Sequence, residues 1–356
     1  MSIHSKPLLF LVVFLINIGV WGQSSSINNK SIKQIAAGGH HCVVLLTDGH
    51  LWAWGRNTGG QLGDGSTIDR IDPVQIGFEK TWASVTAGKG FTHAIKKDGT
   101  LWGWGINKVG QLGISTTNFK FMYSSPTQVG KDNDWQMVSS GKNFTIGLKT
   151  DGTIWVWGAN IYHLIKEKIN QYEPIKIDDK NNKNWKQIAA GDEFFMAIKR
   201  NGSLWTMGKI NGDNMAFVKI NDDRDWASMD AGTRHAMAIK NDDSLWSWGY
   251  NNHGQLGNGT TTNSKNPIKI GENYSAVSTT GHYTGAINKN GIGVWWWGKS
   301  VISRKMQSTP VQMPGTSYLE FIATGDDTLY LLMDELSILE FSQNNEIGNF
   351  SLKRIK

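Results

Sequence analysis

Apolar and polar residues alternate in short segments along most of this chain. In the clearest copy, the segments 82–88, 92–96 and 100–105 are separated by a glycine step and by the turn Asp98-Gly99. Alternation with a period of two is typical of half-buried β-strands, and Asp-Gly between two such segments is typical of a hairpin whose two turn residues take positive φ. Each copy of the pattern therefore predicts a small antiparallel sheet.

A pair of tryptophans closes each copy and shows how often the pattern repeats. The glycines that follow these pairs are residues 55, 105, 158, 208, 249 and 298, a spacing of about 48 residues. The fourth copy keeps one tryptophan of the pair, and a seventh copy at 338–342 has lost both. Tryptophans two positions apart lie on the same face of a strand. We therefore expect these rings to pack inside the sheets rather than to form a binding site.

Two further motifs predict a fourth strand in most repeats. The segments 55–63, 105–113 and 249–257 read Gly-x-Asn-x-x-Gly-Gln-Leu-Gly, and we expect their glycines to serve backbone conformation. In five repeats an apolar segment opened by proline follows, and proline is tolerated at the first residue of a strand. Four short strands in each of seven repeats predict an all-β, seven-bladed β-propeller, with segments 351–353 and 32–35 close together at the ring closure.

These motifs resemble the regulator-of-chromosome-condensation repeat family. The resemblance is carried by the modules 37–41 and 231–235, both Ala-Gly-x-x-His, and by the Asp-Gly-Thr-Leu-Trp and Gly-Gln-Leu-Gly runs. It covers residues 32–356 and implies a seven-bladed propeller. The family includes exchange factors, photoreceptors, ligase-associated modules and secreted inhibitors of β-lactamases, so the resemblance does not by itself name a function.

The first 22 residues differ from the repeats. Lys6 precedes an apolar segment from Leu8 to Val20, and the small residue Gly22 follows. This arrangement is typical of a secretory signal peptide, and the apolar segment is short for a membrane span. We therefore expect a signal peptide at 1–22 and a single propeller domain at 23–356. The mature protein would be secreted, periplasmic or at the cell surface, without stable membrane insertion. An uncleaved membrane anchor is the alternative.

Composition and charge narrow the classes of function. Cys42 is the sole cysteine, which excludes an intrachain disulfide. The net charge of +6 is spread along the repeats without a dense basic tract, so we expect no nucleic-acid partner. The sequence contains no nucleophile elbow, His-Glu-x-x-His motif or phosphate-binding glycine loop. We therefore expect neither an enzyme nor a cofactor.

His40 and His41 form the most metal-like pair in the sequence. No third ligand lies at a useful spacing from them. Phenylalanine takes the place of the second histidine in three other copies, at Phe91, Phe144 and Phe194. We therefore expect a packing role for this position and no metal site.

One loop of the second repeat is longer than its equivalents in the first and fifth, and it is aromatic where they are polar. Aromatic residues and methionine are enriched at protein-binding surfaces. In the third copy an aromatic segment replaces the Gly-Gln-Leu-Gly run, and we expect it to adjoin that loop. A fold-back of these side chains over the blade edge is the alternative. The candidate binding residues are Phe119, Phe121, Met122, Tyr123, Tyr162 and His163.

The sequence favours a secreted, monomeric, non-enzymatic propeller that binds an unidentified protein through one loop face. A binder of carbohydrate or surface polymer is the alternative, and exposed aromatic residues in several blades would favour it. An enzyme with clustered carboxylates in the central channel is a third hypothesis. Among family functions, ultraviolet sensing fits less well, because the Gly-Trp-Arg-His-Thr pattern of the photoreceptor is matched only in part by residues 232–236.

Overall fold

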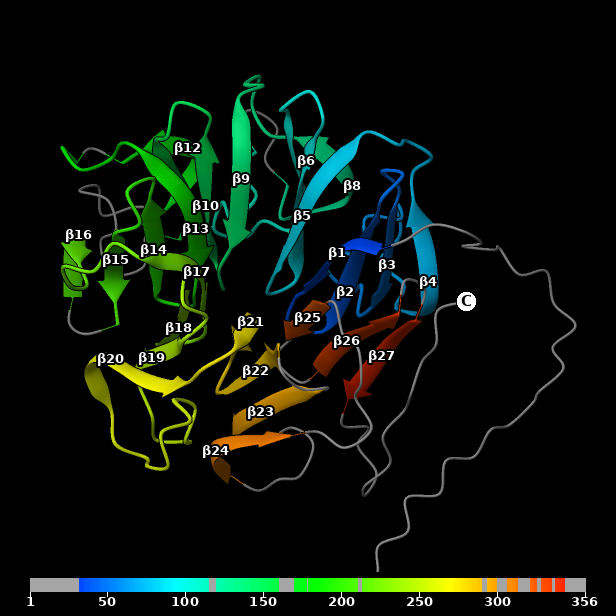
Figure 1. Cartoon of the computed structure of the whole chain (residues 1–356). Coiled ribbons are helices and arrows are strands. Elements are labelled where there is room, and N and C mark those ends of the chain that lie inside the picture. Colours follow the sequence, from blue (N-terminus) through cyan, green and yellow to red (C-terminus); the bar gives the residue numbers. More distant parts are fainter. Residues whose placement is uncertain are drawn as a thin grey trace, which may run out of the picture.

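The computed structural model consists of β-strands joined by turns and loops (Figure 1). Within the described segments it has 27 strands and no helix that could cross a membrane. The expected signal peptide and the closing segment 351–353 lie outside the described residues. The structure describes residues 32–114, 120–159, 170–177, 179–210, 213–289, 293–299, 306–312, 321–324, 328–334 and 337–342.

The strands form consecutive antiparallel sheets, in each of which the strand order follows the sequence. The first two sheets contain β1 (Ile32–Ala37), β2 (His41–Leu46), β3 (Leu51–Gly55), β4 (Arg70–Ile76); and β5 (Trp82–Gly88), β6 (Phe91–Lys96), β7 (Leu101–Ile106), β8 (Met122–Gln128). The next two contain β9 (Trp135–Ser140), β10 (Phe144–Lys149), β11 (Ile154–Gly158), β12 (Gln171–Lys176); and β13 (Trp185–Ala190), β14 (Phe194–Lys199), β15 (Leu204–Lys209), β16 (Asp213–Lys219). The last three contain β17 (Trp226–Ala231), β18 (His235–Lys240), β19 (Leu245–Gly249), β20 (Ser264–Gly271); β21 (Tyr274–Thr280), β22 (Tyr283–Asn288), β23 (Val294–Lys299), β24 (Met306–Gln312); and β25 (Phe321–Thr324), β26 (Thr328–Asp334), β27 (Ser337–Ser342).

The sheets are arranged around a common centre as the blades of a β-propeller (Figure 1). The first strand of each sheet is the inner strand, and it packs against the inner strand of the next sheet. The circle is completed where β25 packs against both β21 and β1. The all-β propeller predicted from the repeat is therefore confirmed.

The prediction of seven four-stranded blades is wrong for the last repeat. Six sheets have four strands, whereas the sheet formed by β25, β26 and β27 has three within the described residues. The sequence gives a reason, since the seventh copy has lost its tryptophans and no proline-containing strand motif follows it. The fourth repeat also lacks the proline, yet it forms its fourth strand, β16.

Proline does not open the outer strands, as the sequence suggested; it lies inside them. Pro73 is the fourth of the seven residues of β4, and Pro126 is the fifth of β8. These strands pair on one side only, with β3 and β7. A proline without an N–H is tolerated at such an edge, because the missing donor faces away from the partner strand.

The hairpin turns also differ from the expected type. Gly99 has a φ of 83°, but Asp98 does not have positive φ. Instead, the Asp98 carboxylate accepts hydrogen bonds from the N–H and the hydroxyl of Thr100, and Thr100 Oγ1 accepts one from Trp102 Nε1. The same relay recurs in three more blades. It explains the Asp-Gly-Thr-Leu-Trp motif, because each side chain orients the next.

The Gly-Gln-Leu-Gly runs connect neighbouring blades. Gly63 of the first repeat has a φ of 82°, and a Cβ there would lie 2.6 Å from the indole of Trp104 in the second blade. Gly113 and Gly257 have the same relation to Trp157 and Trp297. The backbone of each run therefore covers a tryptophan of the next blade. The expected conformational role of these glycines is confirmed by their positive φ.

Candidate binding surfaces

The tryptophans of the repeat build the interior of the blades, as expected. Trp104 and Trp82 are buried together, and the half-buried Trp102 packs against the same cluster. Trp82 meets the two other rings at centroid distances of 6.0 and 6.1 Å. Edge-on and tilted packing of this kind adds to the stability that burial of the rings provides.

The two histidines of the pair lie in different environments. His40 is exposed and His41 is fully buried, so the two side chains point away from each other. The His41 ring packs against Gly38, where a Cβ would lie 2.3 Å from it, and its Nε2 shares a hydrogen bond of 2.9 Å with Thr92. Burial, together with the neighbouring His40, lowers the pKa of His41 to about 3. The described residues contain no group of three or more His, Cys, Asp or Glu that could hold a metal ion.

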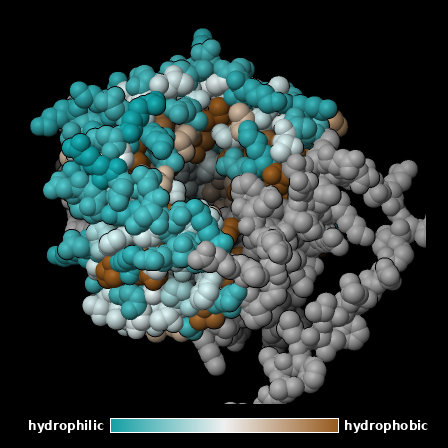
Figure 2. All heavy atoms as spheres, viewed as in Figure 1, coloured by the Kyte–Doolittle hydropathy of each residue, from teal (hydrophilic) through white to brown (hydrophobic). Residues whose placement is uncertain are grey.

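A cavity of about 300 Å³ lies at the centre of the ring, and the space-filling view shows this hollow (Figure 2). It is lined by residues of the inner strands of all seven sheets, many of them small or hydroxyl-bearing. Two acidic side chains, Asp192 and Asp230, and two lysines, Lys89 and Lys142, contribute charge. The sequence predicted a channel but did not show which residues line it.

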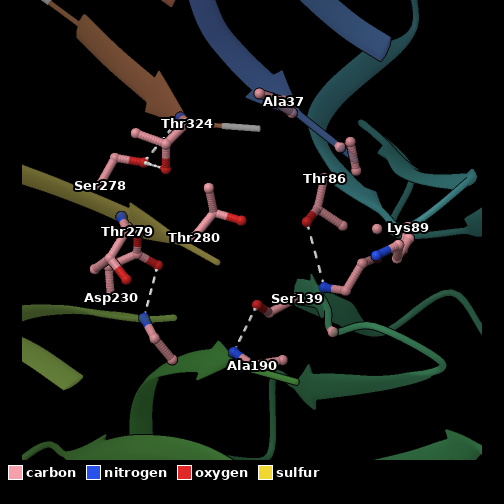
Figure 3. Close-up of a pocket in the computed structure, with 18 of the residues that line it drawn as sticks. Ala37, Thr86, Lys89, Ser139, Ala190, Asp230, Ser278, Thr279, Thr280 and Thr324 are labelled. Atoms are coloured by element: carbon pink, nitrogen blue, oxygen red, sulfur yellow. Dashed lines mark hydrogen bonds between the residues drawn. The ribbon is translucent and has the colours of Figure 1, made fainter. Parts of the chain in front are cut away.

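Many of the hydroxyl groups in this cavity hold neighbouring blades together (Figure 3). At the seam between the first two blades, the amide oxygen of Gln34 accepts a hydrogen bond from Val85 N at 3.1 Å. At four other seams, a hydroxyl or carboxylate oxygen of one inner strand accepts a hydrogen bond from a backbone N–H of the next inner strand. The bonds are Thr86 Oγ1 with Ser140 N at 3.3 Å, Ser139 Oγ with Ala190 N at 3.0 Å, Asp230 Oδ2 with Thr279 N at 2.7 Å, and Ser278 Oγ with Thr324 N at 3.2 Å. These oxygens are therefore engaged in contacts between blades.

Asp230 differs from the other members of this series because it carries a carboxylate. Its second oxygen accepts a hydrogen bond from the N–H of Ala231, and Ser278 contributes another. Burial raises the pKa of Asp230 to about 6, although these hydrogen bonds oppose the rise. The second channel carboxylate, Asp192, accepts a bond from the hydroxyl of Thr233 instead.

At the seam between the fourth and fifth blades, where the fourth repeat lacks a Gly-Gln-Leu-Gly run, a pair of charged side chains joins the blades. The guanidinium of Arg234 donates two hydrogen bonds, of 2.6 and 2.8 Å, to the carboxylate of Glu193. Such a two-pronged pair fixes the relative position of two blades. Neither residue was singled out from the sequence as a pair, because the contact depends on how the blades meet.

The aromatic loop of the second repeat remains the most exposed apolar region among the predicted sites. Phe121 is 66% exposed and Met122, at the start of the edge strand β8, is 43% exposed, whereas Tyr123 is half-buried. The alternative, that these side chains fold back over the blade edge, is wrong for Phe121 and Met122. Phe119, Tyr162 and His163 lie outside the described residues, so their expected proximity stays a prediction.

A second exposed aromatic side chain lies elsewhere. Phe78 is 91% exposed in the loop between β4 and β5. Because the strands of a blade alternate in direction, this loop is at the opposite end of the blades from the loop between β7 and β8. Phe78 therefore does not extend the surface of Phe121 and Met122.

The amino-acid sequence is similar to known repeat proteins. Segments match two descriptions of the "Regulator of chromosome condensation (RCC1) repeat": one at 32–61, 82–111, 138–163 and 226–255, and the other at 48–95, 98–148 and 242–286. Together they cover more than half of the chain. The chain is 30% identical over 150 residues to the Arabidopsis thaliana "Ultraviolet-B receptor UVR8", which is 39% of this chain and 34% of that protein. It is 26% identical over 154 residues to the Xenopus laevis "Protein RCC2 homolog", 41% and 30% of the two chains. These alignments span about a third of each relative's length.

Solved structures share the fold at low identity. Prp20p of Saccharomyces cerevisiae superposes with a TM-score of 0.72 at 17% identity, over 83% of this chain and 80% of that one. Human WBSCR16 superposes with a TM-score of 0.75 at 16% identity, over 86% and 87%. The propeller architecture, the repeat motifs and their matched segments agree. The chain belongs to the regulator of chromosome condensation (RCC1) repeat family.

Proposed function

We propose that this chain is a non-enzymatic propeller that binds a protein partner through the surface of Phe121 and Met122. The observation that carries this proposal is the exposure of both side chains, 66% and 43%, side by side in sequence at the edge of the second blade. Aromatic residues and methionine are enriched in protein interfaces, and their burial by a partner would be favourable.

Relatives with the same fold support this mode of action. The structure of Prp20p was described together with its binding properties to Gsp1p and histones, and yeast RCC1 was crystallised with Kap60 bound to it. In this chain the inter-blade hydrogen bonds and the tryptophan packing occupy the strands. The loops at the two ends of the blades remain for recognition.

We also propose that the three-stranded sheet of β25, β26 and β27 acts as a seventh blade. Its inner strand packs against the inner strands on both sides, β21 and β1. An inner strand in this position has the same neighbours as the inner strand of a complete blade, so the sheet would close the ring in the way the other repeats do.

Export is a further part of the proposal. Residues 1–22 have the composition of a signal peptide, and we propose that the protein works outside the cytoplasm as a monomer. Expression in a host with a secretory pathway tests this. Amino-terminal sequencing of the exported protein should begin near Gln23, and a protein that retains Met1 in the cytoplasm would refute export.

The binding proposal is tested by affinity capture from extracellular proteins with matched variants. The double variant Phe121→Ser/Met122→Ser should lose the captured partner, because it removes the apolar surface without touching a buried residue. Phe78→Ser is the control, since it removes an even more exposed ring at the other end of the blades. Equal capture by all three proteins would refute the role of this surface. Capture of glycans in a parallel array would instead favour the carbohydrate alternative.

A further inference from the structure

Each of the four blades from the second to the fifth contains a lysine whose ammonium group lies near two tryptophan rings. We call each such group of three side chains a cage. In each, the lysine at the end of the second strand places its Nζ 4.0 to 5.1 Å from the centroids of two tryptophan rings. An ammonium over an aromatic face is attracted by the electrons of the ring. The cage lysines are Lys96, Lys149, Lys199 and Lys240.

In three of the cages a carboxylate completes the arrangement. Glu79 lies 2.5 Å from Lys96 Nζ in the second blade. In the third blade Lys149 Nζ lies 2.6 Å from Asp132 and 2.9 Å from Asp134. In the fifth blade the corresponding partners of Lys240 are Asp223 and Asp225, at 2.6 and 3.1 Å. All of these acids belong to the loop that leads into the first strand of the blade.

In the part of the fourth blade that the structure describes, no carboxylate is paired with the lysine. Asn182 and Asn184 occupy the positions that correspond to Asp132 and Asp134. Asn182 is buried and bonds to the backbone of Ile154, and Asn184 takes a left-handed φ of 64°. Among the described residues, Lys199 has no acidic group within ion-pair distance.

Asp179, whose negative charge acts on Lys199, is engaged in other contacts. Asp179 accepts hydrogen bonds from the backbone N–H groups of Asn181 and Phe217. Burial and the positive charge of Lys183 lower the pKa of Lys199, against a small opposing effect of Asp179. In contrast, the carboxylate partners raise the pKa of Lys149 and Lys240 despite their burial. Lys199 thus carries the desolvation cost of a caged ammonium without a counter-ion.

The caged lysines differ in exposure, and Lys199 and Lys96 are both half-buried. In contrast, Lys149 and Lys240, covered by their acids, are buried. The exposed Lys183 and Lys186 belong to the same repeat, and the positive charge of Lys183 acts on Lys199. The half-buried Lys199 therefore keeps part of its surface in contact with solvent.

We propose that the open cage of Lys199, Trp185 and Trp205 binds a carboxylate side chain from an acidic segment of a partner protein. The same chain shows the bound arrangement three times, with its own acids in the place of the ligand. The cage lies at the hairpin end of the blades, opposite to Phe121 and Met122, because the strands alternate in direction. It would be a second recognition site, and it rests on the proposed function only in assuming a protein partner.

The test uses a fluorescent hexaglutamate peptide, titrated into the chain at low salt and followed by anisotropy. Lys199→Gln should weaken binding by about tenfold, because a partly desolvated charge pair is lost. Lys186→Gln is the matched control: it removes one positive charge from the same blade outside the cage and should have little effect. Lys199→Arg, which keeps a cation over the rings, should retain most of the affinity.

Several results would overturn the proposal. One is an equal loss in Lys199→Gln and Lys186→Gln, which would indicate general charge attraction. Another is the absence of peptide binding to the unaltered chain. Competition by sodium acetate shows whether a free carboxylate is sufficient; a failure of acetate at high concentration to compete would contradict carboxylate recognition. The variant Phe121→Ser/Met122→Ser should bind hexaglutamate normally, so the two sites can fail independently.

Discussion

The carboxylate of Asp230 gives the propeller a seam whose stability depends on pH. Asp230 Oδ2 accepts a hydrogen bond from the backbone N–H of Thr279, with an N···O distance of 2.7 Å. At other seams, the hydroxyl groups of Ser139 and Ser278 accept the equivalent hydrogen bonds. The replacement Asp230→Ser therefore keeps an acceptor at this position and removes the buried charge. We expect the variant to be more stable than the unaltered protein at neutral pH.

The magnitude follows from the pKa of Asp230. Burial raises it from 3.8 to about 6, and each pKa unit corresponds to about 1.4 kcal/mol. The folded state thus binds more protons than the unfolded state between about pH 4 and pH 6, so stability falls as pH rises through this window. Above it, the buried charge costs about 3 kcal/mol at most. Since serine offers one acceptor oxygen instead of two, we expect a net gain of about 1–2 kcal/mol for the variant.

Urea unfolding at several pH values from 4 to 8 measures this difference. The free energy of unfolding of Asp230→Ser, minus that of the unaltered protein, should rise between pH 4 and pH 6 and then level off. Other titrating groups cancel in the subtraction because they are common to both proteins. A difference that does not change with pH would refute the assignment of a buried, proton-binding carboxylate at this seam.

Three further predictions concern the contacts between blades. Gly63→Ala should destabilise the fold by clearly more than Gly77→Ala, because both glycines have positive φ but only a Cβ at Gly63 would meet a tryptophan ring. In urea unfolding, Gly77→Ala should cost about 1 kcal/mol. Equal losses in the two variants would contradict the packing of Gly63 on Trp104. Trp104→Ala should cost about 3–5 kcal/mol in the same measurement, and a loss below 1 kcal/mol would refute its role in the core. Arg234→Ala should lower the free energy of unfolding by less than about 1 kcal/mol, because the Arg234 side chain is 40% exposed. The loss should become smaller in high salt, which screens the ion pair. A loss that does not depend on salt would show that the pair with Glu193 is not electrostatic.

The repeat pattern was sufficient to predict the sheets, the tryptophan packing and the family. Alternation at 92–96 and 100–105 corresponds to β6 and β7 almost residue for residue. These features are local, because a strand and its hairpin are built from neighbouring residues. The turn type was wrong for a local reason too: the side chain of Asp98 orders the turn, so one glycine with positive φ is enough.

The seams between blades could not be predicted in the same way. Whether Asp230 faces solvent, the channel or the next blade depends on the angle at which two sheets meet, and no single repeat contains that information. The lack of an ion-pair partner for Lys199 among the described residues is evident only by comparison with the three equivalent cages, whose lysines are paired with acids. Exposure of Phe121 was suggested by composition, but fold-back over the blade edge was equally compatible with the sequence.

Because Gly63 packs against Trp104 of the next blade, a single blade is not a self-contained module for protein engineering. A tryptophan and the Gly-Gln-Leu-Gly run that covers it belong to successive repeats. A module transplanted with its boundaries between sheets would therefore lose both contacts: its tryptophan would lack the covering run, and its own run would lack the tryptophan of the next blade. A segment that starts just after one tryptophan pair and ends with the next carries both halves of the contact. Designed chimaeras or duplications of this propeller should therefore be joined at that offset, near residues 55 and 105.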